Sequence, residues 1–223
     1  MTENPQVLTR QLESTLATNS VIRNTYILLS LTLLFSALTA GVAMATNAPM
    51  LNVWLVLGGY FGLLFATHKL RNSAWGLLAV FALTGFMGYT LGPLLNAYIG
   101  HYANGAQLVV YALGGTGVIF ISLSAYALTT RKDFSFMGGF LMAGILIAFL
   151  AGIANIFFAM PGLALAVSTM FMLLMCGLIL YETSNLVHGG ETNYILATVG
   201  LYVTIYNLFT SLLHLLGVFG GDD

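Results

Sequence analysis

Long apolar runs dominate the amino-acid sequence, and short breaks between them hold most of the polar residues. A helix needs about 20 apolar residues to cross the hydrocarbon core of a bilayer. Seven runs of about that length occur, over residues 26–45, 51–67, 74–95, 106–128, 136–158, 163–187 and 194–218. A segment surrounded by lipid must pair its backbone polar groups internally, so each run is expected to be an α-helix. The pattern predicts an all-α integral membrane protein, a bundle of seven transmembrane helices.

The composition supports this prediction and excludes several other classes of protein. Hydrophobic residues make up 59% of the 223-residue chain and charged residues 6%, whereas about 25% of the residues in soluble domains are charged. The net charge of −1 gives no electrostatic basis for binding nucleic acid. One cysteine, Cys176, excludes an internal disulfide and a cysteine-based zinc site.

The positive charges predict the orientation, because cytoplasmic loops of membrane proteins are enriched in Lys and Arg. All six lie on one side of the predicted bundle: Arg10, Arg23, Lys69, Arg71, Arg131 and Lys132. We therefore expect a flexible cytoplasmic tail over 1–24, a transmembrane domain over 25–219 and a short periplasmic tail over 220–223. The first apolar run, at about 20 residues, exceeds the apolar core of a signal peptide, so we expect it to be retained.

Motifs of intramembrane enzymes are missing from the sequence. There is no H-E-x-x-H zinc motif and no G-x-S-x-G nucleophile elbow. Glycine-rich nucleotide motifs are missing as well, and the four histidines lack the spacing of metal ligands. We expect no enzymatic activity, no cofactor and no dedicated metal site.

Glu182 is the one carboxylate inside a predicted span. A charge there is costly, so this side chain should face the protein interior or water, or be protonated; a glutamate that reaches the lipid headgroups is the alternative. Asn185 lies three residues further on and shares its helix face. In the last span, polar residues recur every three or four positions: Thr204, Asn207, Ser211 and His214. These residues form either interhelical hydrogen bonds or a buried polar pathway.

Two pairs of glycines have the small-xxx-small spacing that lets helices approach closely. They are Gly58 with Gly62, and Gly88 with Gly92, the second followed by Pro93. We expect both pairs to pack against helices of the same chain.

Three segments carry a resemblance to a known family. They are residues 85–94 (GFMGYTLGPL), residues 126–139 (YALTTRKDFSFMGG), and residues 180–183 (LYET) continuing to Asn207. In order and spacing they resemble the Bax inhibitor family, also called the transmembrane Bax inhibitor motif family. Residues 23–26 (RNTY) and 188–194 (HGGETNY) are most similar to its proteobacterial inner-membrane branch of FtsH protease modulators. The resemblance covers the chain after about residue 20.

The resemblance implies two different functions. Some bacterial relatives are pH-sensitive calcium leak proteins, in which two aspartates on the last two spans share a proton. Their positions correspond to Glu182, a conservative match, and Thr204, a departure that leaves one carboxylate. Calcium prefers several oxygen ligands, so Glu182 is the candidate ligand if calcium is conducted, with Thr204, Asn207 and Asn185 along a path for calcium or protons.

The other implied function is modulation of FtsH, a membrane-anchored protease that pulls substrates into the cytosol by a flexible end. The polar N-terminal tail would serve as such an end, although an ordinary disordered terminus has the same composition. The tail residues expected to engage the protease are Thr2, Glu3, Asn4, Arg10 and Glu13. We expect a multi-pass protein of the bacterial inner membrane, in contact with the lipid bilayer and the FtsH complex, that inhibits FtsH and thereby limits degradation of membrane proteins.

Overall fold

The structure is a computed structural model that describes residues 5–221 and, from Leu16 onward with the exception of Ala17, their side chains. The helices are α1 (Pro5–Ala45), α2 (Val53–Leu70), α3 (Ala74–His101), α4 (Gly105–Thr130), η1 (Ser135–Met137), α5 (Gly138–Phe158), α6 (Pro161–Val187) and α7 (Tyr194–Gly220). Over residues 5–221 there is no strand, and seven helices are long and apolar enough to cross a membrane. The prediction of an all-α protein with seven spans is confirmed.

Local sequence explains several helix ends. The side chain of Asn52 accepts a hydrogen bond from the backbone N–H of Trp54 (2.9 Å) and so caps the start of α2. Helix α5 ends at Phe158, and the next residue, Ala159, has a left-handed backbone conformation (φ 48°). Helix α6 begins at Pro161, where the missing backbone N–H would have no partner within the helix. Pro93 lies inside α3, which nevertheless continues to His101, as transmembrane helices tolerate.

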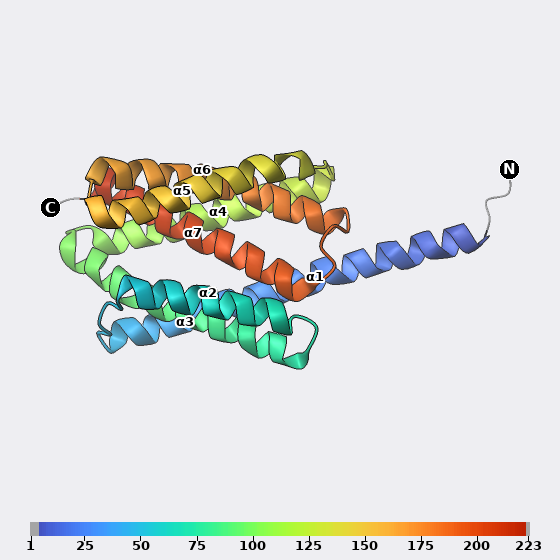
Figure 1. The fold of residues 1–223 in the computed structure, drawn as a ribbon, viewed down its shortest axis with the longest axis horizontal. Helices are drawn as coiled ribbons and strands as arrows, with labels where there is room; N and C mark the ends of the chain where they lie inside the picture. The colour runs from blue at the N-terminus through green and yellow to red at the C-terminus, as the bar shows by residue number, and fades with distance from the viewer. Residues whose placement is uncertain (1–4, 222–223) are drawn as a thin grey trace.

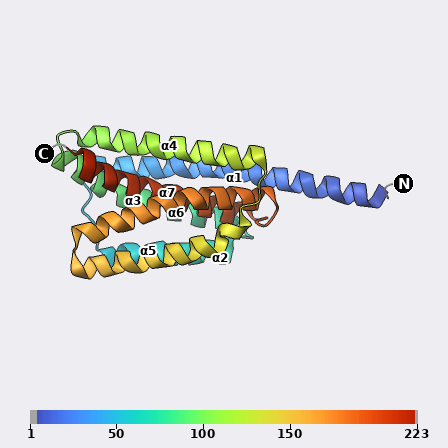
Figure 2. The same cartoon turned by 90° about the horizontal axis from the view of Figure 1, so that it is seen from above.

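Helix α7 occupies the centre of the bundle (Figure 1). It packs against α1, α2, α3, α4 and α6. In α7, 56% of the apolar spanning stretch is buried, compared with 6% in α2 and 11% in α5. Figure 2 shows α2 and α5 at the opposite edge of the bundle from α4. Helix α7 therefore joins the bundle, whereas α2 and α5 present most of their surface to lipid.

The buried apolar side chains form three clusters, and α7 contributes to each of them. Tyr202 belongs to the cluster with α1 and α3, Phe209 to the cluster with α3 and α4, and Leu208 to the cluster with α5 and α6. Phe209 and Leu208 are adjacent in the sequence and belong to different clusters, so α7 buries apolar side chains on more than one face.

Close contact between α1 and α3 depends on two glycines of α3. A Cβ added at Gly88 would collide with the backbone oxygen of Ser36 and the hydroxyl of Thr39, and one added at Gly92 would lie 2.5 Å from the Cβ of Ala43. The second glycine pair behaves differently. Among the described residues, no atom lies within 4 Å of a Cβ added at Gly58 or Gly62. The expectation that this pair packs within the chain was wrong, because that face of the peripheral helix α2 is turned away from the bundle.

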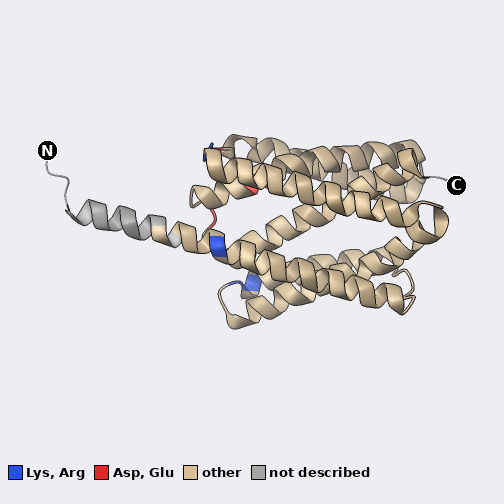
Figure 3. Cartoon of the chain, turned by 180° about the vertical axis from the view of Figure 1, so that it is seen from behind, with Lys and Arg blue, Asp and Glu red and all other residues tan. Residues whose placement is uncertain are grey.

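The described Lys and Arg residues gather at one end of the bundle (Figure 3). They lie near the start of the packed part of α1 (Arg23), at the end of α2 (Lys69, Arg71) and after α4 (Arg131, Lys132). The loop between α6 and α7 lies at the same end, since the Asn193 side chain donates to the backbone oxygen of Arg71 (3.1 Å).

Helix α1 extends well beyond the bundle at this basic end (Figures 1 and 2). Its first side chains in the apolar core are Val21 and Ile22. Helical conformation therefore includes residues 5–24, most of the segment expected to be a flexible tail, and the flexibility of that segment stays a prediction. Thr2, Glu3 and Asn4 lie outside the described residues; Arg10 and Glu13 lie on the projecting part of α1.

Candidate functional site

Glu182 of α6 points toward α7 and pairs with Thr204. The Thr204 hydroxyl donates a hydrogen bond to Oε2 of Glu182 at 3.0 Å, and Thr204 is fully buried. These are the two positions that the family resemblance had placed opposite each other. A carboxylate buried between two helices needs such a donor, because an unpaired polar group there is costly.

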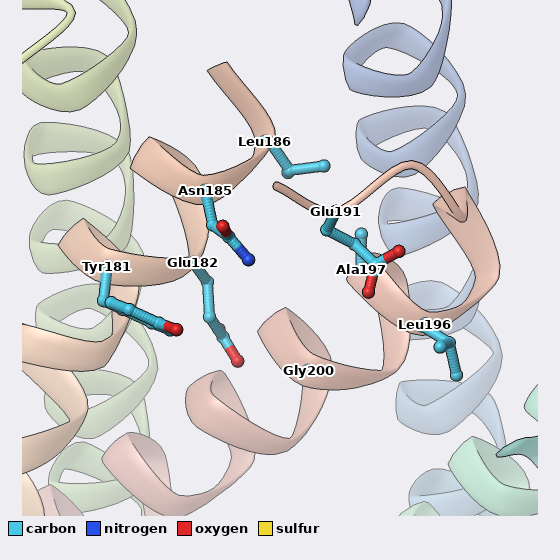
Figure 4. Close-up of a pocket in the computed structure, with 8 residues that line it drawn as sticks. All are labelled: Tyr181, Glu182, Asn185, Leu186, Glu191, Leu196, Ala197 and Gly200. Atoms are coloured by element: carbon cyan, nitrogen blue, oxygen red, sulfur yellow. The ribbon is translucent and has the colours of Figure 1, made fainter. Parts of the chain in front are cut away.

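Gly200 makes room for the carboxylate. It lies one turn before Thr204 on α7, on the same helix face, and a Cβ added there would lie 2.6 Å from Oε1 of Glu182. The close-up in Figure 4 shows Glu182 extending toward the ribbon of α7 beside Gly200. A larger residue at this position would fill the space that the carboxylate occupies.

A cavity of about 160 Å³ lies beside Glu182, between α6, α7 and the loop that joins them. Its lining residues are Tyr181, Glu182, Asn185, Leu186, Glu191, Leu196, Ala197 and Gly200 (Figure 4). Sites for organic ligands usually measure about 300–1,000 Å³. This cavity therefore suits waters or a small ion better than a metabolite.

The cavity contains two carboxylates, Glu182 and Glu191. Oε1 of Glu191 already accepts a hydrogen bond from the backbone N–H of Asn193 (2.7 Å). Within residues 5–221, no group of three or more His, Cys, Asp or Glu side chains is placed to hold a metal ion. The cavity therefore offers two carboxylates, but among the described residues no cluster marks a dedicated metal site.

Asn193 fixes the loop that carries Glu191. Its side-chain oxygen caps α7 by accepting from the backbone N–H groups of Ile195 (3.0 Å) and Leu196 (3.2 Å). Its side-chain amide donates to the backbone oxygen of Arg71 (3.1 Å) and to Oδ1 of Asn72 (2.9 Å) in the α2–α3 loop. One side chain thus ties two loops together at the mouth of the cavity.

The remaining polar residues of the predicted stripe do not all join this site. Asn185 lines the cavity with Glu182, whereas the Asn207 amide donates to the backbone oxygen of Val203 in its own helix (2.8 Å). His214 Nδ1 lies 2.8 Å from the hydroxyl of Ser168 on α6. The structure therefore brings Glu182, Thr204 and Asn185 together and separates Asn207 from them.

A cluster of hydroxyl groups was not predicted from the sequence. Tyr26 of α1 donates to Ser124 of α4 (3.0 Å), and Ser124 lies 3.2 Å from the hydroxyl of Thr183 on α6. The three helices are thus linked by hydrogen bonds. Thr183 directly follows Glu182, but no spacing in the sequence relates it to Tyr26 or Ser124.

Comparison with known proteins places the chain among bacterial membrane proteins. It matches the family described as "Inhibitor of apoptosis-promoting Bax1" over residues 18–221. It is 55% identical over 205 residues to an uncharacterized protein of Pseudomonas aeruginosa, covering 92% of each chain. It is 52% identical over 209 residues to the Escherichia coli K12 protein named "Modulator of FtsH protease YccA", covering 94% of each. A protein of Escherichia coli O6:H1 named "Inner membrane protein YccA" is similar to the same extent.

These similarities agree with the fold. Seven helices can cross a membrane, and a relative that covers nearly the whole chain is named an inner membrane protein. The chain is a multi-pass inner-membrane protein. The E. coli K12 relative is named as a regulator of a protease and not as an enzyme.

Proposed function

The chain belongs to the Bax inhibitor family, and from this premise we propose that it binds the FtsH protease in the inner membrane and inhibits it, limiting the degradation of membrane proteins. The name of the E. coli relative supports a role in modulating FtsH. The observation that carries the binding step is the projection of α1 beyond the packed helices (Figure 1).

The proposed orientation places this projection in the cytoplasm. The described Lys and Arg residues lie at the end from which α1 projects (Figure 3), and positive charge favours the cytoplasmic side. With an odd number of spans, the C-terminus then lies in the periplasm. The projecting segment would face the compartment into which FtsH pulls its substrates.

We propose that the projection acts as a handle and the bundle as a block. FtsH would engage the polar end of α1, including Arg10 and Glu13, and would then meet the closely packed helices. Gly88 and Gly92 place α3 directly against α1, so pulling on α1 has to break this interface. Slow extraction would keep the protease occupied and away from other substrates.

The test is a deletion of residues 2–15, compared with a variant in which the same residues are scrambled. The deletion ends before Thr18 and Ile22, so the packed part of α1 stays intact. We expect the deletion to abolish co-purification with FtsH and to shorten the half-life of another membrane substrate. The scrambled variant should still co-purify with FtsH and should leave the half-life of the other substrate as long as with the wild type, because a handle depends on length and polarity. Unchanged co-purification after deletion would contradict the handle.

A second candidate function, a pH-sensitive leak for calcium or protons, is favoured by the hydrogen bond between the half-buried Glu182 and the buried Thr204, and by the small cavity beside it. Glu191 brings a second carboxylate to that cavity. Only Glu182 lies inside a span, so Glu182 would be the sensor in this function.

Liposomes loaded with calcium test the leak. Flux through the wild type should depend on pH, and Glu182→Gln should remove that dependence. Glu191→Gln is the matched control, since it alters the cavity mouth and leaves the Glu182–Thr204 pair intact. A wild-type flux equal to that of empty vesicles at every pH would rule the leak out.

A further inference from the structure

A second and larger cavity lies in the other half of the bundle. It has a volume of about 490 Å³ and is bounded by α1, α3, α4 and α7. Leu33 and Met44 mark its two ends on α1, Leu113 and Gly117 line it from α4, and Ile205 and Phe209 line it from α7. We call this cavity the α1–α4 trough. It shares no lining residue with the cavity beside Glu182.

The trough lies beyond the point where α1 and α4 meet, which is the hydrogen bond between Tyr26 and Ser124. Among the described residues, no Cα atom of α1 lies within 8 Å of one in α4, whereas α7 packs against both. In the view of Figure 3, α7 crosses behind the space between them. Helix α7 thus forms the floor, and the open side between α1 and α4 faces the surrounding lipid.

The polar groups that reach the trough are already hydrogen bonded to other protein atoms. The hydroxyls of Ser36 and Tyr202 lie 2.7 Å apart, and the Thr116 hydroxyl donates to the backbone oxygen of Ala112 (2.7 Å). The Tyr206 hydroxyl lies 3.3 Å from that of Thr90. The lining therefore offers an apolar surface, and an apolar ligand suits it best.

The length of the trough matches one leaflet of a bilayer. Leu33 and Met44 are about 17 Å apart along α1, at about 1.5 Å per residue. Half of the hydrocarbon core is about 15 Å thick. Met44 comes directly before Ala45, the last residue of α1, so the trough runs from that surface of the bundle to about the middle of the membrane.

The length of the trough decides between a lipid chain and a helix of another protein. A helix that spans the membrane is about 30 Å long, whereas the trough extends about 17 Å along α1 from Leu33 to Met44. A single acyl chain is narrow, flexible and apolar. Two glycines leave the space between the walls open: no atom lies within 4 Å of a Cβ added at Gly41 or Gly117.

We propose that the α1–α4 trough binds one acyl chain of a membrane lipid, from the leaflet at the end of the bundle that carries the α1–α2 loop. The chain enters between α1 and α4 and lies on Ile205 and Phe209 of α7. It fills the space between α1 and α4 beyond their Tyr26–Ser124 hydrogen bond, and so completes the packing of the bundle.

The test uses full-length protein in vesicles that contain phosphatidylethanolamine with a photoreactive diazirine on one acyl chain. Cross-linked residues are located by mass spectrometry. In the wild type, adducts should concentrate on trough residues such as Leu113 and Phe209. Adducts spread evenly over the outer lipid-facing residues, such as Leu38 and Val118, would overturn the proposal, as would cross-links from trough residues to a second protein chain.

A filling variant provides the second arm. Gly41→Leu combined with Gly117→Leu places two side chains in the trough, and we expect trough adducts to fall at least about tenfold, equivalent to about 1.4 kcal/mol of binding. Gly114→Leu is the matched control, because Gly114 is equally unhindered on α4 but does not line the trough. Equal adduct levels in a folded filling variant would overturn the proposal. If that variant does not fold, the adduct positions in the wild type decide alone.

Discussion

Gly200 on α7 and Glu182 on α6 share one space: a Cβ at position 200 would lie 2.6 Å from Oε1 of Glu182. The other carboxylate oxygen accepts the hydrogen bond from Thr204, one turn further along α7. Helix α7 thus holds the carboxylate with a glycine on one side and a hydroxyl on the other. The position of Glu182 is determined by its neighbouring helix as much as by its own.

The Glu182–Thr204 hydrogen bond should appear as a coupling energy. In a double-mutant cycle with Glu182→Met and Thr204→Val, which remove the acceptor and the donor, we expect a coupling of about 0.6–1.7 kcal/mol, from the average to the maximum measured for hydrogen bonds between membrane helices. The measurement is unfolding in mixed detergent micelles. A cycle between Glu182 and Asn207 serves as the control, because the Asn207 amide bonds to Val203. Equal coupling in the two cycles would contradict the assigned pair.

Gly200→Ala should disrupt this pair. The added methyl group takes the space of Oε1, so the carboxylate has to move, and the coupling between Glu182 and Thr204 should fall to about zero in this background. Gly115→Ala is the control, since its Cβ would meet Leu212 Cδ1 at an ordinary 3.7 Å. If the full coupling between Glu182 and Thr204 remained in Gly200→Ala, the carboxylate would not depend on the space that Gly200 leaves.

Gly88→Ala should loosen the contact between α1 and α3. The added Cβ would collide with the backbone oxygen of Ser36, and no side-chain rotation can relieve this collision. We therefore expect the free energy of unfolding to fall by about 1–3 kcal/mol because of overpacking. Gly58→Ala is the matched control: its Cβ meets nothing within 4 Å among the described residues, and alanine favours a helix by up to about 1 kcal/mol over glycine. Thermal unfolding in detergent should separate the two variants, and equal melting temperatures would refute the tight interface.

Asp133, in the loop between α4 and η1, should titrate at an unusually low pH. The backbone N–H of Ser135 donates to its Oδ1 (2.8 Å), and this bond, with a smaller contribution from the Ser135 side chain, lowers the pKa of Asp133. A carboxylate whose pKa is lower in the folded than in the unfolded protein stabilises the folded state at pH values above its ordinary pKa. This stabilisation is lost as the pH falls through the lowered pKa.

An NMR titration of the Asp133 carboxyl in micelles measures its pKa in three states of the protein. The pKa should be lowest in the folded wild type, higher in Ser135→Ala, which keeps the backbone donor, and highest in the unfolded chain. Asp133→Asn identifies the resonance. Identical values in the folded and unfolded wild type would mean that the Ser135 bond does not form in solution.

Sequence reasoning recovered the seven spans because the apolar runs and the breaks between them are strong signals. It also placed the chain in its family, as residues 18–221 confirm. The exact ends were less accessible: α3 continues beyond Pro93 to His101, and α1 begins at Pro5. Residues 5–17 are mostly polar, and their leucines at positions 8, 12 and 16 have helical spacing but are too few to form the long apolar run by which the spans were predicted.

The site was predictable only in part. Glu182 is conspicuous as a carboxylate in an apolar span, and the resemblance supplied Thr204 as its counterpart. Asn207 has the right spacing but bonds to its own helix, an outcome that depends on side-chain rotation. The role of Gly200 requires knowing that α6 and α7 pack at that height, and Gly58 and Gly62 have a packing spacing on a helix face that has no neighbour.

Helix α1 is continuous from its projecting end to the interface with α3, and this continuity has a mechanical consequence. A force applied to the projecting end acts along the helix axis, parallel to the row of contacts at Gly88 and Gly92. Contacts loaded in this direction share the force and must slide together, whereas contacts pulled from the side would peel apart one after another. If the proposed function holds, the bundle would therefore resist a pull on this end of α1.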